Sequence, residues 1–88
     1  MGTRNNPGKF DCHARALPDE PLFTVLARDQ SAPWMVQQWA FEREREITAG
    51  LRPESDREMV EEARQVARAM QKWRAENDGV WRQPLCPT

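Results

Sequence analysis

Residues 56–77 read DREMVEEARQVARAMQKWRAEN and carry the clearest helical pattern in the chain. Apolar side chains recur there at alternating spacings of four and three residues, which places them on one face of a helix. This apolar stripe consists of Met59, Ala63, Val66, Met70 and Trp73, with Val60 and Ala67 beside it. Ser55 and Glu58 have the spacing of a capping box, and Asn77 with Gly79 marks an end. We therefore predict a helix over residues 56–77.

A second helix is predicted over residues 32–49. Ser31 and Pro33 are typical of a helix start, and Gly50 suits the left-handed residue that ends a helix. One face of this helix would consist of Val36, Trp39, Ala40, Arg43 and Ile47, with Trp34 and Phe41 off that face.

A first helix is predicted over residues 19–29. Asp19 can cap free amide groups, and Pro21 is tolerated in a first turn. The apolar run that follows suits burial, although a buried strand over residues 22–26 is an alternative because short apolar runs do not distinguish the two. Residues 10–17 are expected to be extended or irregular.

The composition limits the chain to one small domain. It has 88 residues, of which 39% are hydrophobic and 31% charged, and a net charge of -1. A chain of this length buries a thin core. We predict a mostly α, three-helix domain over residues 10–79, with a flexible, irregular N-terminus at 1–9 and a Pro-bounded C-terminal tail at 80–88. No apolar run reaches the roughly 20 residues of a membrane span, and residues 1–8 lack a signal-peptide pattern, so a cytoplasmic protein is expected.

No catalytic or cofactor site is expected. The chain has one His, no Tyr and no glycine-rich loop. Cys12 and His13 are adjacent, so they are expected to point in different directions, and no third group orients the imidazole. With Cys86 they supply at most three zinc ligands plus a carboxylate. We interpret Cys12 as a small buried thiol beside a surface imidazole, and we predict no enzyme activity, metal or cofactor.

Tryptophan is abundant, with four residues in the chain. Trp39 and Trp73 fall on apolar faces and are predicted to belong to the core. Trp34 and Trp81 lie off the faces or in the tail, where core and interface are both open alternatives. Because Trp is enriched at binding hot spots, both are candidate partner-binding residues.

A row of basic residues lies on about one face of the third predicted helix. This basic stripe consists of Arg57, Arg64, Arg68 and Lys72. Like charges at a spacing of four residues are slightly unfavourable, which favours an anionic partner, although a solvated face is the simpler interpretation. The net charge of -1 argues against nucleic acid. The apolar stripe would pack within the chain or, alternatively, form the seam of a homodimer.

The chain also resembles a family of small phage and prophage proteins. The resemblance spans about residues 9–74 and depends on the motifs KFDC (9–12), PDEP with Phe23, LARD (26–29), Ala32-Pro33, Trp39-Ala40, RPESD (52–56), EAR (62–64), Ala69-Met70 and Trp73-Arg74. It implies a non-catalytic accessory protein that binds and sterically blocks a host defence complex in the bacterial cytoplasm. Anti-CRISPR inhibitors of CRISPR effectors are such a class. A nucleic-acid-binding accessory protein that uses the basic stripe is the alternative.

Overall fold

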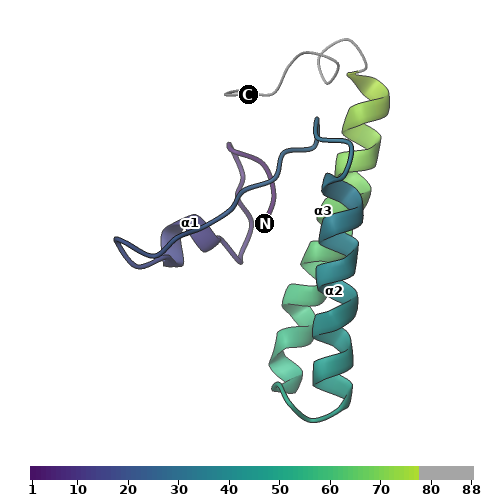
Figure 1. Cartoon of the computed structure of the whole chain (residues 1–88). Helices are drawn as coiled ribbons and strands as arrows, with labels where there is room; N and C mark the ends of the chain where they lie inside the picture. The colour runs from purple at the N-terminus through teal and green to yellow at the C-terminus, as the bar shows by residue number, and fades with distance from the viewer. Residues whose placement is uncertain (78–88) are drawn as a thin grey trace.

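The computed structural model describes residues 1–77, which form helices and irregular chain with no strand in that range. A single-turn helix, α1 (Cys12–Arg15), precedes α2 (Ala32–Thr48). A short 3₁₀ helix, η1 (Glu54–Asp56), then leads into α3 (Arg57–Glu76). Figure 1 shows α2 and α3 side by side as an antiparallel hairpin, with α1 apart from them. The predicted mostly α, three-helix fold is confirmed.

The end of α2 follows the sequence prediction closely. Gly50 adopts a φ of +78°, in the left-handed region. Its N–H donates to Ile47 O at 3.0 Å, and Leu51 N–H donates to Glu46 O at 2.8 Å. These two bonds form a Schellman motif, which satisfies carbonyls that the helix end would leave unpaired. The chain therefore leaves α2 sharply and can return as α3.

The start of α3 differs from the predicted capping box. Ser55 lies inside η1, so Asp56 is the N-cap residue, and among the described residues its side chain makes no capping hydrogen bond. Asp56 N–H instead donates to Pro53 O at 3.0 Å, which closes the 3₁₀ turn. A tight turn that enters the helix directly leaves no place for the extended N-cap conformation that a capping box requires.

The predicted helix over residues 19–29 is wrong, and the alternative strand is not formed within the described chain either. Glu20 N–H donates to Leu17 O at 3.0 Å, and Glu20 Oε1 accepts from Leu17 N–H at 3.0 Å, so Pro18 lies in a turn. Pro21 then restricts the residue before it to extended conformations. A helix this short is also marginal without packing, and Phe23 is 82% exposed.

Small side chains form the centre of the contact between α2 and α3. Ala40 and Ile47 of α2 form one buried cluster with Val60 and Ala63 of α3, and Ala67 of α3 is buried as well. Alanines at these positions let the two helices approach closely, because the distance between packed helices depends on the side chains at the contact. The core is therefore thin, as the chain length predicts.

The larger members of the apolar stripe flank this line instead of forming it. Met59, Val66, Met70 and Trp73 are half-buried. The same is true of Trp39, whose ring lies 4.9 Å from the Arg43 guanidinium carbon. Trp39 and Trp73, predicted to belong to the core, thus lie at its edge. The centre of the interface is shifted by one position along α3, to Val60, Ala63 and Ala67.

Residues 1–9, which the sequence predicts to be a flexible N-terminus, contact α3 together with Phe10 through the Glu62 carboxylate. The Glu62 carboxylate accepts from Lys9 N–H at 3.0 Å, from Phe10 N–H at 3.2 Å and from the Met1 amine at 3.1 Å. Gly8 has a φ of +80°, and a Cβ there would lie 2.9 Å from Glu62 Oε1. The Glu62 carboxylate is therefore the main polar anchor of a segment without helix or strand, beside the Lys9–Glu58 ion pair and the packing of Met1 against the core.

A second contact ties the irregular chain to the far end of α3. The Arg74 guanidinium donates to Arg28 O at 3.0 Å and to Ala27 O at 3.4 Å. Within residues 1–77, no helix combines the length and apolar character that crossing a membrane requires. The predicted tail at 80–88, with Trp81 and Cys86, lies outside the described residues.

Candidate protein-interaction face

Large apolar side chains of α2 remain exposed outside its buried line. Trp34 is 62% exposed and Phe41 is 54% exposed. They are seven residues apart, which is two helical turns, so they lie on one face with Gln37 between them. Single exposed apolar residues are ordinary, but aligned aromatic side chains are typical of interaction sites.

Two residues of the basic stripe of α3 lie beside Phe41. Gln37 and Phe41 of α2 and Arg64 and Arg68 of α3 together line a hollow of about 280 Å³. Trp34 lies one helical turn before Gln37. We call this surface the α2–α3 face, and it consists of Trp34, Gln37, Phe41, Arg57, Arg64, Arg68 and Lys72.

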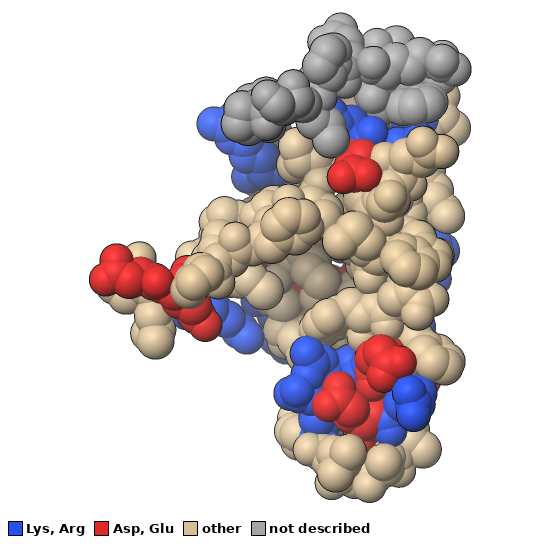
Figure 2. All heavy atoms as spheres, in the orientation of Figure 1, with Lys and Arg blue, Asp and Glu red and all other residues tan. Residues whose placement is uncertain are grey.

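Each basic residue of the α2–α3 face has an acidic neighbour. The ion pairs are Arg57–Glu54 at 2.6 Å, Arg57–Glu44 at 3.8 Å, Arg64–Glu44, Arg68–Glu61 at 3.5 Å and Lys72–Glu76 at 3.9 Å. Figure 2 likewise shows side chains of both signs interleaved at the end of the hairpin. Because the charges balance locally, this surface lacks the net positive field that drives counterion release from nucleic acid.

The ion pairs differ in strength and in how much of the basic side chain they leave exposed. Hydrogen bonding with Arg57 lowers the pKa of Glu54, and the same bond raises the pKa of Arg57. Arg64 is bound across the helix interface by Glu44 and is about one third exposed. Arg68 is 62% exposed, and its ion pair with Glu61 is long, at 3.5 Å. Of the two arginines in the hollow, Arg68 is therefore the one that a partner can bind while breaking the weaker ion pair.

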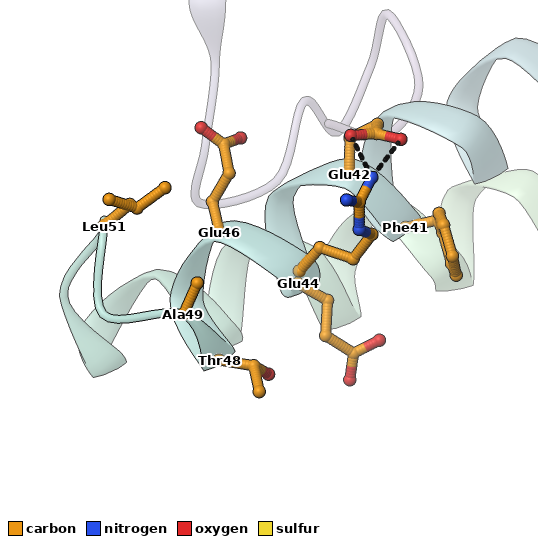
Figure 3. A pocket seen from close by; sticks show the side chains of 8 residues that line it. Phe41, Glu42, Glu44, Glu46, Thr48, Ala49 and Leu51 are labelled. Carbon is orange, nitrogen blue, oxygen red and sulfur yellow. Dashed lines mark hydrogen bonds and ion pairs between the residues drawn. The ribbon is translucent and has the colours of Figure 1, made fainter.

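Phe41 is a site residue that the sequence-based prediction did not include. It lines the hollow with the two arginines and also a second, open one of about 550 Å³ at the end of α2. Figure 3 shows Phe41 and Leu51 at opposite ends of this second hollow. Arg45 also lines it and forms an ion pair with Glu42 at 3.1 Å. The signal that could have identified Phe41 is its position two turns after Trp34 and off the core face.

Cys12 and His13 form no catalytic arrangement in the described chain. Cys12 is exposed and its thiol is free, so the prediction of a buried thiol is wrong. It lies at the start of α1, where Asp11 Oδ1 accepts from His13 N–H at 3.1 Å. The His13 imidazole instead contacts Thr24 Oγ1 at 3.1 Å. Residues 1–77 also contain no group of three or more metal-ligating side chains.

Of the residues that the sequence analysis selected, the structure places Arg64 and Arg68 in one hollow, and it adds Phe41 and Gln37 there. Trp34 lies two turns before Phe41 on α2, and Lys72 lies one turn after Arg68 on α3. Arg57 lies on the same stripe but is already engaged by two carboxylates. Trp81 lies outside the described residues. Comparison of the chain with protein-family models, with curated proteins and with solved structures found no match.

Proposed function

We propose that this chain is a non-catalytic binding protein that contacts another protein through the α2–α3 face. The observation that carries the proposal is the hollow in which Phe41 lies beside Arg64 and Arg68. Aromatic residues and arginine are enriched at the centres of protein interfaces, whereas other charged residues are depleted there. A neutralised surface with exposed aromatic rings fits a protein partner better than a nucleic acid.

The resemblance to small phage and prophage proteins supports a more specific form of the proposal. In that form the partner is a host defence complex, such as a CRISPR effector, and the chain acts sterically by occupying a surface that the complex needs. The alternative is a nucleic-acid-binding accessory protein. The observation that favours it is the exposure of the Arg68 and Lys72 side chains, 62% and 78% respectively.

The test is capture of CRISPR effector subunits from a bacterial lysate by the tagged full chain, followed by affinity measurement with the purified effector. We expect Trp34→Ala and Phe41→Ala each to weaken binding about 30-fold, as is typical of hot-spot residues at about 2 kcal/mol. Phe23→Ala is the matched control, because Phe23 is equally aromatic, 82% exposed and outside the α2–α3 face.

Equal weakening by all three substitutions, or by none, would contradict the proposed face. Salt dependence and nuclease treatment separate the two functions, since Arg68→Glu should weaken binding of either kind of partner. If nucleic acid is the partner, this variant loses binding and the affinity of the unchanged chain falls steeply with salt. If a protein is the partner, nuclease treatment leaves the captured complex intact.

A further inference from the structure

The two hollows that share Phe41 differ in the charged side chains that line them. The smaller one, of about 280 Å³, has Arg64 and Arg68 in its lining and, within residues 1–77, no carboxylate. The larger one, at the end of α2, is lined by one arginine and three carboxylates: Arg45, Glu42, Glu44 and Glu46. Although ion pairs balance the charge of the α2–α3 face as a whole, the smaller hollow therefore favours a negatively charged group.

Both arginines of the smaller hollow keep hydrogen-bond donors that the described chain does not use. A guanidinium carries five N–H donors. Arg64 donates through Nη2 to Glu44, and Arg68 donates through Nη2 to Glu61 at 3.5 Å. Within residues 1–77, the Nε and Nη1 groups of these two arginines have no acceptor. An acceptor that enters the hollow can therefore be bound while the ion pair of Arg64 with Glu44 stays in place.

The lining of the hollow also defines which acceptor fits. The planar guanidinium fork binds a carboxylate through two parallel N–H groups. Phe41 is 54% exposed beside the arginines, so an apolar side chain next to that carboxylate would remove part of the ring from water. The Gln37 amide forms no hydrogen bond with any described residue, so it can donate to and accept from the backbone of a partner.

The size of the hollow favours one or two side chains over a whole small molecule. Its volume of about 280 Å³ lies below the roughly 300–1,000 Å³ of ordinary ligand pockets. A nucleic acid would bring successive phosphates close to Glu44 and Glu61, which are bound to the same arginines and would repel them. A peptide segment can place one carboxylate in the hollow and set uncharged residues against the rest of the face.

We propose that this hollow binds an acidic peptide segment of the partner protein. The carboxylate of an Asp or Glu binds Arg68 and Arg64, and an adjacent apolar side chain packs on Phe41. Glu61 gives way, because its ion pair with Arg68 is long and exposed and such pairs contribute little. The inference rests on the proposed function, since it names the chemistry that the α2–α3 face recognises in its partner.

The recognition of charge is tested with short, acetylated and amidated peptides that share Gly-Ser flanks. Their central residues are Glu-Leu-Glu, Gln-Leu-Gln or Lys-Leu-Lys, and each peptide is titrated into the full chain by NMR. The Glu-Leu-Glu peptide should bind about tenfold tighter than its Gln counterpart, because hydrogen bonds to a charged group are the stronger ones. Its addition should shift the signals of Phe41, the Gln37 amide and the Arg68 guanidinium. Equal affinity for all three peptides, or no binding of the Glu-Leu-Glu peptide at these signals, would overturn the proposal.

Two substitutions of equal charge test whether the hollow itself is the site. Arg68→Gln should weaken binding of the Glu-Leu-Glu peptide about tenfold and leave that of the Gln-Leu-Gln peptide unchanged, since only the charged contact is lost. Lys72→Gln is the matched control, because Lys72 lies one turn further along α3, is 78% exposed and does not line the hollow. Circular dichroism checks that both variants keep their helices. Equal weakening by the two variants would indicate diffuse attraction and contradict a specific site.

The same measurements separate this inference from the proposed function. If Phe41→Ala weakens capture of the effector but the three peptides bind equally, the proposed function stands and the acidic segment is wrong. If the peptides behave as expected but capture does not depend on Phe41, the chemistry of the hollow stands and the proposed function is wrong. Sedimentation equilibrium of the full chain without peptide covers a further occupant: a dimer that Arg68→Gln dissociates would assign the hollow to a second copy and overturn the proposal.

Discussion

The α2–α3 hairpin and the chain that precedes it are ordered by different means. In the hairpin, helical hydrogen bonds and a continuous line of small buried side chains stabilise each other. Residues 1–31 have only the single turn of α1 and bury little apolar surface. They depend on point contacts, chiefly the carboxylate of Glu62 and the guanidinium of Arg74.

This difference indicates where the molecule is robust and where it is vulnerable. Stability in the hairpin is spread over many contacts between neighbouring turns, so it should fail cooperatively. Order in the N-terminal segment depends on a few charged groups, so it should be lost locally when one of them changes. Four predictions, from the largest expected effect to the smallest, test this contrast.

Ile47→Ala should have the largest effect. Ile47 is 3% exposed in the centre of the hairpin contact. Its truncation should lower the free energy of unfolding by about 3 kcal/mol through lost burial and the cavity left behind. Leu51→Ala is the matched control, since Leu51 is 75% exposed and should cost less than about 0.5 kcal/mol. Chemical denaturation measures both, and similar losses for the two would contradict the assigned core.

Glu62→Gln should release the N-terminal segment while the helices persist. The variant replaces a charged acceptor of three hydrogen bonds with a neutral amide, so docking should weaken by about 2 kcal/mol. Amide hydrogen exchange at Lys9 and Phe10 should accelerate accordingly, with unchanged helical circular dichroism. Glu58→Gln is the control, because its ion pair with Lys9 is exposed and should contribute little.

The same contact should respond to acid. Burial alone would raise the pKa of Glu62, but hydrogen bonds from Lys9, the Met1 amine and Phe10 outweigh it and lower the pKa below its ordinary 4.5. The ionised form is therefore the docked one. Docking should be complete above about pH 4.5 and should be lost as the pH falls through the lowered pKa. Glu62→Gln should remove the dependence of docking on pH. If docking in this variant still depends on pH, a group other than Glu62 is responsible.

Substitution of a left-handed glycine should have a smaller effect on stability, and this effect should differ between the hairpin and the N-terminal segment. Gly50 and Gly8 both have left-handed φ values, +78° and +80°. A Cβ at Gly50 would meet nothing within 4 Å, so Gly50→Ala should cost only the conformational term, about 1 kcal/mol. Gly8→Ala should in addition push against Glu62 and Met1 and weaken docking further. Thermal unfolding and amide hydrogen exchange at Lys9 compare the Gly50→Ala and Gly8→Ala variants. If Gly8→Ala changes neither measurement, docking tolerates a displaced segment.

Local chemistry was enough to predict α2 and α3 because their apolar spacing, start and stop signals agree. Prediction failed over residues 19–29, where Asp19 and Pro21 match a helix start but the chain forms a turn. Asp and Pro occur both at helix starts and in turns. The neighbouring sequence did not indicate that this segment would lack packing against α2 and α3. The single turn at Cys12–Arg15 is too short to produce a periodic pattern.

For the candidate face, spacing alone identified the basic stripe and placed Trp34 off the apolar face of its helix, with core and interface both left open for it. It did not identify Phe41 as a neighbour of Arg68, because that contact depends on how α2 and α3 are aligned. It also did not identify the partners of Arg57 and Arg64, both of which share Glu44 on the other helix.

Helix identity, the left-handed turn at Gly50 and a thin core therefore follow from residue order, because they depend on interactions within a few residues. Three features required the folded chain: the shift of the buried line to Val60, Ala63 and Ala67, the role of Glu62 as an anchor, and the balance of charge on the α2–α3 face. Each joins residues that are far apart in sequence. Tertiary packing decides such contacts, because periodicity indicates which face a residue occupies but not what lies opposite it.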